Sequence, residues 1–223
     1  MSKILVVPDI HGRDFWKKPC QKWQESIVFL GDYHDPYDLS IYQPSKKESL
    51  DNLKELVDFV TKRRKDIKEY PTVCLCGNHD WSYYTGHYRC RYDYGHSKEV
   101  LELLNKLELQ FMFILNSGKS FLFSHAGITK SWLNFHNIES PKKFEKEHIK
   151  FVEDVPYSRG GDSPYGSFLW NSLSDYKKDE HLSEYYQVFG HTWMDEPVIT
   201  DTYAMLDCCK CFVINNDNIK PYE

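Results

Sequence analysis

Aspartate, asparagine and histidine side chains follow five short apolar runs of this sequence. ILVV at residues 4–7 leads directly into PDIHG, SIVFL leads into GDYHD, and TVCLC leads into GNHD. FLFSHAG and QVFGHT repeat the pattern later in the chain with a histidine. The polar residues at these positions are Asp9, His11, Asp32, Asp35, Asn78, His79, Asp80, His125 and His191. They offer oxygen and imidazole donors, a set that suits manganese, iron or zinc, whereas magnesium and calcium favour nearly all-oxygen sites.

The apolar runs have the composition and length of buried strands. Between the second and third runs, residues 44–67 have the pattern of an amphipathic helix, because Ser45 and Glu48 form a capping box and apolar side chains recur at helical spacing. A strand, a helix and a further strand in this order predict parallel pairing in an α/β sheet. Open α/β sheets bind ligands at the edge where their strands end. We therefore expect the donor residues to converge there.

The segment at residues 81–96 begins directly after GNHD, is rich in tyrosine and has no clear period, which predicts an irregular loop. Its aromatic side chains interleave with Arg89 and Arg91 along the sequence, so the loop could stack a nucleobase and hold phosphate. These aromatic side chains could equally form apolar contacts that hold the loop against the rest of the protein. Residues 111–127 read as a hairpin, and residues 129–155 carry two modest helical patterns, one on either side of Pro141. The sequence shows no repeats and no linker, so a single domain over residues 1–223 is predicted.

Composition and charge argue against several classes of function. A chain of 223 residues with 41% hydrophobic residues suits a soluble domain with a substantial core. Its net charge of −5 argues against nonspecific binding to nucleic acid or to a membrane surface, since both favour a basic protein. No apolar run approaches the roughly 20 residues that span a bilayer. Asp9 and His11 interrupt the N-terminal apolar run, whereas a signal peptide has a longer uninterrupted one. We therefore expect a cytoplasmic protein.

The seven cysteines do not predict a disulfide framework, because their number is odd and no secretory signal is expected. CCKC at residues 208–211 could suggest a zinc site. Zinc ligands usually come as spaced pairs, however, and no second Cys/His pair near this run completes four ligands. Packed thiols are the preferred interpretation.

The ordered motifs DIHG, GDYHD, GNHD, SHAG and GHT resemble those of the calcineurin-like metallophosphoesterases. Within that superfamily the chain is most similar to the phosphoprotein phosphatase branch, which includes bacterial diadenosine tetraphosphatases. The motifs extend from residue 9 to residue 192, nearly the whole chain. The resemblance implies an α/β fold in which two mixed β-sheets pack face to face in a sandwich flanked by helices. It also implies a centre of two transition-metal ions, with manganese expected first and iron or zinc as alternatives.

The resemblance assigns a role to each donor residue. The implied ligands are Asp9 and His11 for the first ion, Asp32 as the bridge between the two ions, and Asn78, His125 and His191 for the second ion. A hydroxide held between the metals would attack phosphorus directly, without a covalent intermediate. His79 would be the general acid that protonates the leaving oxygen, and Asp35 would orient its imidazole.

Two positions depart from the pattern of the phosphoprotein phosphatases. In that branch an arginine follows the carboxylate equivalent to Asp35 and grips the substrate phosphate, whereas this chain has Pro36. Another guanidinium is therefore expected to bind the phosphate oxygens, and the first candidates are Arg13, after DIHG, and Arg159, in SRGGDSPYGSFLW. Asp80 stands where protein phosphatases usually carry glutamate.

These observations predict a binuclear-metal phosphoesterase that hydrolyses a phosphate monoester or a nucleotide phosphoanhydride. A phosphorylated small molecule or nucleotide is favoured over a phosphoprotein because of Pro36 and the aromatic segment. A serine/threonine protein phosphatase is the alternative, and an inactive scaffold that kept the fold is a further one. A scaffold would be expected to lose the acid histidine or a metal ligand, yet His79 and every implied ligand are present.

Overall fold

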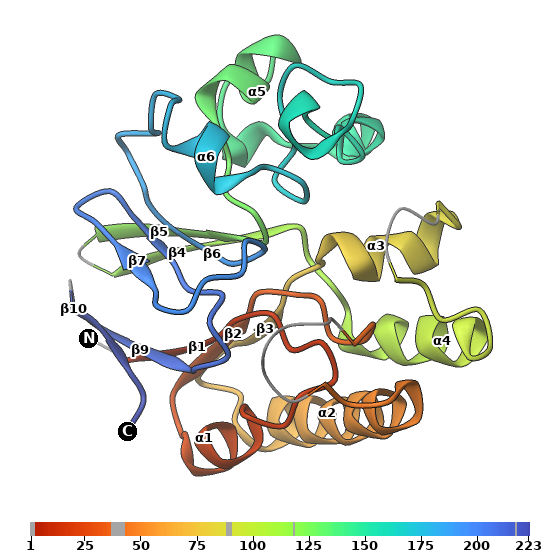
Figure 1. Cartoon of the computed structure of the whole chain (residues 1–223). Helices are drawn as coiled ribbons and strands as arrows, with labels where there is room; N and C mark the ends of the chain where they lie inside the picture. Colours follow the sequence, from red (N-terminus) through yellow and green to blue (C-terminus); the bar gives the residue numbers. More distant parts are fainter. Residues whose placement is uncertain (1–2, 37–42, 88–90, 118, 217) are drawn as a thin grey trace. The chain divides into compact units, whose positions relative to one another are not determined.

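The computed structural model describes residues 3–36, 43–87, 91–117, 119–216 and 218–223 of the chain (Figure 1). The chain divides into two compact units, one made of residues 1–110 with 209–223 and the other of residues 111–208. Each unit contains a mixed five-stranded sheet. The predicted α/β class with two mixed sheets is therefore confirmed. The face-to-face packing of the sheets and the single domain over residues 1–223 stay predictions.

The sheet of the first unit has the strand order β10-β9-β1-β2-β3. Its strands are β1 (Ile4–Val7), β2 (Ser26–Phe29), β3 (Thr72–Cys74), β9 (Phe212–Asn215) and β10 (Asn218–Pro221). The first three run parallel, with Ile4 opposite Ser26 and Val28 opposite Val73. This confirms the parallel pairing that the strand, helix and strand order predicts. On the other side of β1, the antiparallel strand β9 brings residues from far along the sequence next to the first strand.

The helices described in the first unit are α1 (Lys17–Lys22), α2 (Lys46–Asp66), α3 (Asn78–Thr85) and α4 (Ser97–Leu107). α2 begins with the predicted capping box: the Glu48 amide donates to Ser45 Oγ at 3.2 Å, and the Ser45 amide donates to the Glu48 carboxylate at 2.8 Å. Leu53 and Leu56 on the apolar face of α2 belong to the same buried cluster as Phe29 of β2. Burial of a leucine of this kind contributes roughly 1.5–3 kcal/mol, so this cluster anchors the sheet that carries the first motifs.

The tyrosine-rich segment predicted as a loop over residues 81–96 begins as a helix instead. Its residues 81–85 form the C-terminal part of α3, which ends at Gly86 in the left-handed conformation with φ of 71°. The sequence shows no helical period there because α3 buries polar as well as aromatic side chains. The buried residues of α3 are Asn78, His79, Asp80, Ser82 and Tyr83. Residues 91–96 are irregular, as predicted, and residues 88–90 lie outside the described residues.

The sheet of the second unit has the strand order β4-β5-β6-β8-β7. Its strands are β4 (Met112–Ser117), β5 (Lys119–Ser124), β6 (Tyr186–Phe189), β7 (Val198–Ile199) and β8 (Tyr203–Met205). β4 and β5 form the predicted antiparallel hairpin, with Phe113 opposite Phe123. β5, β6 and β8 run parallel. SHAG and GHT therefore follow two neighbouring parallel strands, which is the arrangement that the sequence predicts.

Short helices complete the second unit. They are α5 (Lys130–Phe135), α6 (Leu173–Tyr176) and the 3₁₀ helices η1 (Pro141–Lys143), η2 (Lys146–Phe151) and η3 (Tyr157–Arg159). Of the two helical patterns predicted around Pro141, the first is the α-helix α5 and the second is the 3₁₀ helix η2.

In the part of the chain that the structure describes, no helix is both long and apolar enough to cross a membrane. Cys208 and Cys211 of the CCKC run are buried and Cys209 is half-buried. Among the described residues, the groups of side chains that could hold a metal ion contain no cysteine. The burial of Cys208 and Cys211 agrees with their interpretation as packed thiols, whereas Cys90 lies outside the described residues.

Candidate metal centre

The turns after the first two strands hold three predicted site residues in a rare backbone conformation. His11, Asp32 and Asp35 have φ of 46°, 53° and 55°, in the left-handed region that side chains other than glycine seldom adopt. His191 in the second unit has φ of 68°. Each such residue costs of order 1–3 kcal/mol, and strain of this kind concentrates at functional sites. Four of the motif residues thus take this conformation, which also occurs elsewhere in the described residues, at Glu108, Asn137, Cys209 and Asn216.

Backbone hydrogen bonds lock the DIHG turn to the GDYHD turn. The amides of Ile10 and His11 both donate to the carbonyl of Asp32, at 3.1 and 2.7 Å, and the amide of Gly12 donates to the carbonyl of Tyr33 at 3.0 Å. Since β1 and β2 are parallel neighbours, their strand ends already lie side by side. The hydrogen bonds between the turns then fix which side chains face each other.

The Asp80 carboxylate joins the GDYHD turn to the GNHD turn. Its Oδ2 accepts the amides of Asp32 and Gly77, both at 2.8 Å, and its Oδ1 accepts the amide of Tyr33 at 3.1 Å. Burial raises the pKa of Asp80 to about 7, against the lowering effect of these three donors. A glutamate would carry its carboxylate one methylene further from the helix, so the aspartate suits this short reach. The motif residue that departs from the protein phosphatases therefore has a structural task here.

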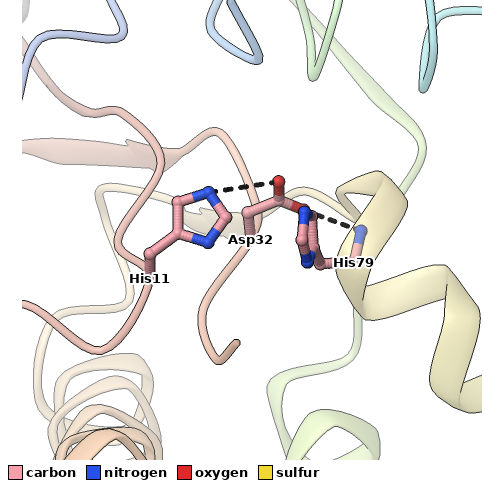
Figure 2. A group of neighbouring side chains, drawn as sticks. All are labelled: His11, Asp32 and His79. Atoms are coloured by element: carbon pink, nitrogen blue, oxygen red, sulfur yellow. Dashed lines mark hydrogen bonds and ion pairs between the residues drawn. The ribbon is translucent and has the colours of Figure 1, made fainter. Parts of the chain in front are cut away.

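The Asp32 carboxylate lies between His11 and the start of α3 (Figure 2). Its Oδ1 accepts the amide of His79 at 3.0 Å, and its Oδ2 lies 3.5 Å from His11 Nε2. His11 Nδ1 lies 2.9 Å from the backbone carbonyl of Asp35. A carbonyl can only accept, so Nδ1 carries the proton and Nε2 turns its lone pair toward the Asp32 carboxylate. Backbone contacts of this kind orient metal-binding histidines.

The charge balance of this cluster fits a cation. Burial raises the pKa of Asp32 well above its ordinary value, and the nearby charges of Asp9 and Asp80 raise it further. Burial also lowers the pKa of His11 well below its ordinary value, helped by His79 and Arg13. Buried carboxylates that repel one another, facing a neutral imidazole lone pair, form a site that a metal ion would stabilise. His11, Asp32 and His79 offer donor atoms within 4.8 Å of one another, and all three are buried.

His79 and Asp35 form the predicted carboxylate–imidazole pair. His79 Nδ1 lies 3.2 Å from Asp35 Oδ2, and Asp35 is fully buried. Burial raises the pKa of Asp35 to about 6. Burial, with the charges of Arg91 and His34, lowers the pKa of His79 to about 3, so without a bound anion the imidazole is neutral at pH 7. A negative ligand beside it would raise that pKa.

The second unit brings the other two predicted ligand histidines together. His125 Nε2 lies 3.1 Å from His191 Nδ1, and the two rings meet edge to face with centroids 4.9 Å apart. The rings of Trp170 and His191 are nearly perpendicular, with centroids 6.1 Å apart. Arg159 donates from Nη2 to Thr192 Oγ1 at 2.8 Å, which places this predicted phosphate-binding residue next to the GHT motif.

The remaining predicted residues also lie at these motifs. Asp9 is 1% exposed, and Asn78 is the buried first residue of α3. Arg13 is 5% exposed although it carries a charge, and it is close enough to lower the pKa of His11. Pro36, at the position where the sequence comparison with the phosphoprotein phosphatases led us to expect an arginine, is buried.

Sequence reasoning missed Tyr83, whose hydroxyl donates to Asp35 Oδ1. Tyr83 follows His79 by four residues, which on a helix places both side chains on one face. That spacing is the signal that would have found it, once α3 was recognised as a helix. Sequence reasoning also did not predict the hydrogen bonds from backbone amides to the Asp80 carboxylate, although it identified Asp80 as part of the GNHD motif.

Comparisons with known proteins agree with the motifs. A family model described as calcineurin-like phosphoesterase matches residues 2–194. A structure described as a cold-active protein-tyrosine phosphatase of a psychrophilic Shewanella species is 14% identical, covers 100% of this chain and 81% of that chain, and has a TM-score of 0.60. A second structure, described as cold-active protein tyrosine phosphatase, is 15% identical, covers 99% and 78% of the two chains, and has a TM-score of 0.64. No curated protein matches the chain.

Gly77→Ala should disturb the metal site through Asp32. A Cβ at this position would lie 2.0 Å from Asp32 Oδ1 and 2.6 Å from the Asp32 amide nitrogen, so the carboxylate must move. We expect metal affinity to fall about 10–100-fold, as when the outer contacts of a ligand are lost. Isothermal titration with Mn²⁺ measures it. Gly95→Ala is the matched control, since its Cβ would meet Asp93 Oδ1 at 3.5 Å, an ordinary contact. Equal affinities of the two variants would contradict this account of Asp32.

Metal binding should weaken as the pH falls. The raised pKa of Asp32 means that the metal-free carboxylate holds its proton to higher pH than usual, and a cation must displace that proton. His11 adds no such dependence, because its lowered pKa leaves it neutral. Below the pKa of Asp32, we expect about tenfold lower Mn²⁺ affinity per pH unit for one proton released. Titrations at several pH values between about 5 and 8 measure it, and an affinity independent of pH throughout that range would rule the account out.

Proposed function

The chain belongs to the calcineurin-like phosphoesterase family and is a metal-dependent phosphoric ester hydrolase, and we propose that it uses a binuclear metal centre to hydrolyse a phosphate monoester or a nucleotide phosphoanhydride. The observation that carries this proposal is the buried cluster in which the lone pair of His11 Nε2 faces the Asp32 carboxylate at 3.5 Å. Two acceptors at this distance repel each other unless a proton or a cation lies between them.

The proposed ligands come from five motifs. They are Asp9 and His11 for the first ion, Asp32 for the bridge, and Asn78, His125 and His191 for the second ion. A carboxylate suits the bridge because two cations need a shared anionic ligand. The amide and imidazole ligands are neutral, which keeps the total charge of the site positive enough for phosphate. Metal ions bound there would polarise the phosphoryl oxygens and lower the pKa of water.

Within this centre, the chain's own acid is His79. In the resting state its Nδ1 proton lies on the side of Asp35 Oδ2, so Nε2 is the atom that can take up a second proton. The negative charge of a bound phosphate ester raises the pKa of His79 from its low resting value and so favours that protonation. The imidazolium, stabilised by Asp35, would then give its proton to the leaving oxygen.

Arginines beside the motifs would bind the phosphate oxygens. Arg13 is nearly buried next to the DIHG turn, and Arg159 contacts Thr192 beside the GHT motif. Arg91 is a third candidate, because its charge lowers the pKa of His79 and it must therefore lie near that ring. Guanidinium groups suit this role because they bind phosphate oxygens with two parallel hydrogen bonds.

A phosphorylated small molecule or a nucleotide is the proposed substrate class, since the arginine clamp of protein phosphatases is replaced by the buried Pro36. A phosphotyrosine peptide is the second candidate. The observation that favours it is the likeness of the fold to the two cold-active protein-tyrosine phosphatases. Serine/threonine phosphopeptides are the third class of candidate substrate.

A substrate screen with defined metal content tests the proposal. Purified protein with added Mn²⁺ is assayed on p-nitrophenyl phosphate, its bis-ester, dinucleoside polyphosphates and phosphopeptides, with metal measured by elemental analysis. We expect two metal ions per chain, activity lost with chelator and restored by Mn²⁺, and both ions weakened in Asp32→Asn. Full activity of metal-free protein would overturn the mechanism. Two tightly held ions with no activity on any ester would identify an inactive scaffold.

His79→Asn should separate acid catalysis from metal binding. General acid catalysis contributes about 10²–10⁴-fold, and an alkyl phosphate needs it because an alkoxide is a poor leaving group. p-Nitrophenolate is stable as an anion, so its ester should lose much less. The measurement is kcat on esters with graded leaving-group pKa, with metal content checked in parallel. A uniform loss along the series, or loss of metal, would remove His79 from the acid role.

A further inference from the structure

We propose that Tyr83 is a positioning residue for the acid His79 and acts through the Asp35 carboxylate. The inference rests on the proposed function, because it assigns a partner to the proposed acid. It adds a third member to the pair that the motifs predict, from a part of the chain where the sequence predicts only a loop.

Tyr83 and His79 hold opposite oxygens of the same buried carboxylate. His79 Nδ1 lies 3.2 Å from Asp35 Oδ2, while the Tyr83 hydroxyl donates to Asp35 Oδ1. Asp35 is 0% exposed and Tyr83 is 4% exposed, so water does not replace either contact. A donor on each oxygen fixes the plane of the carboxylate, and the plane of the carboxylate fixes the direction of the imidazole.

Tyr83 is itself held in place on three sides. Its hydroxyl oxygen accepts the amide of Asp93 at 2.9 Å, and its ring stacks on Tyr92 with centroids 4.4 Å apart and planes 21° apart. The ring also lies against that of His34 in a T-shaped arrangement, with centroids 6.2 Å apart. Because Tyr83 stands one helical turn after His79 on α3, the helix sets the distance between the acid and its support.

The contact with Asp93 ties this unit to the irregular segment at residues 91–96. The Asp93 carboxylate lies 3.3 Å from His34 Nε2 and 2.8 Å from His96 Nδ1, and it accepts the amide of Gly95 at 3.1 Å. His34 is fixed in turn by a hydrogen bond of 2.7 Å between its Nδ1 and Ser49 Oγ. The tyrosine hydroxyl thus lies between a rigid hydrogen-bonded network and the carboxylate that orients the acid.

A neutral donor suits this position better than a cation would. A lysine or arginine on Asp35 would neutralise the carboxylate and weaken its attraction for the imidazolium of His79. A phenol hydroxyl satisfies the buried oxygen and leaves the negative charge in place.

Tyr83→Phe tests the proposal, because it removes the hydroxyl and keeps the ring. The variant is assayed with Mn²⁺ on the same series of graded phosphate esters as His79→Asn. We expect kcat to fall about 5–10-fold on alkyl esters, a fraction of the acid's own contribution, and less than about twofold on p-nitrophenyl phosphate. Metal content and KM should stay unchanged. Site-specific 3-fluorotyrosine at position 83, which keeps the donor, should restore kcat.

A double-mutant cycle with Asp35→Asn shows whether the hydroxyl acts through Asp35. When Asp35→Asn is already present, Tyr83→Phe should cost little further activity, because the carboxylate that it positions is gone. Tyr186→Phe is the matched control: it removes another buried tyrosine hydroxyl, which donates to the carbonyl of Thr200 at 2.9 Å. That variant should lose stability without any change that depends on the leaving group.

The outcomes separate this inference from the proposed function. A graded loss for His79→Asn with a uniform loss for Tyr83→Phe would leave the acid in place and overturn the role of Tyr83. Additive losses in the cycle would overturn it too. No graded loss for His79→Asn, or no phosphoesterase activity at all, would overturn both. If Tyr83→Phe lowers the melting temperature too far for assay, the protein with tyrosine at position 83 is compared with the protein with 3-fluorotyrosine there. The more acidic phenol should shift the His79 ¹⁵N resonances of zinc-loaded protein. An unchanged spectrum would overturn the contact.

Discussion

The first unit's site depends on the Asp80 carboxylate and the three backbone amides that it binds. The contacts to Asp32, Tyr33 and Gly77 hold two strand-end turns against each other at 2.8–3.1 Å. Two of these amides belong to a turn in which Asp32 takes a left-handed backbone conformation. A free turn would relax toward ordinary dihedral angles, so the strain in this one must be offset by contacts such as these. The Asp32 carboxylate, which is the proposed bridge, is thereby held in place by the fold itself.

Preorganisation of this kind explains why so many ionisable groups can be buried close together. Asp9, Asp32, Asp35 and Asp80 are each at most 2% exposed. In a flexible site such carboxylates would move apart or turn toward water. Here the backbone hydrogen bonds between the turns prevent that, and burial, together with the repulsion between the carboxylates, raises the pKa values of Asp32 and Asp80. A cation that enters relieves the repulsion, so the fold contributes to metal affinity in advance of binding.

The sequence predicted the parallel core, the capping box and the site motifs because each leaves a local signature. An apolar run ending in Gly-Asp or Gly-Asn-His can be read without knowing the fold. The sequence did not predict α3 as a helix. Its buried residues Asn78, His79 and Asp80 are polar, so the segment shows no apolar stripe at helical spacing. The contact of Tyr83 with Asp35 joins residues 48 positions apart, and no local pattern records a pairing at that separation.

The pairing of β9 with β1 has a consequence for the order in which the chain can fold. Val6, three residues before Asp9, lies opposite Phe212, so the strand that leads into the DIHG motif gains one of its two neighbours only when β9 has left the ribosome. Until then, β1 offers an unpaired edge of four buried apolar residues, the kind of edge on which other chains can associate. Contacts this distant in sequence also slow folding. The first strand to be synthesised is therefore among the last to gain both of its neighbours.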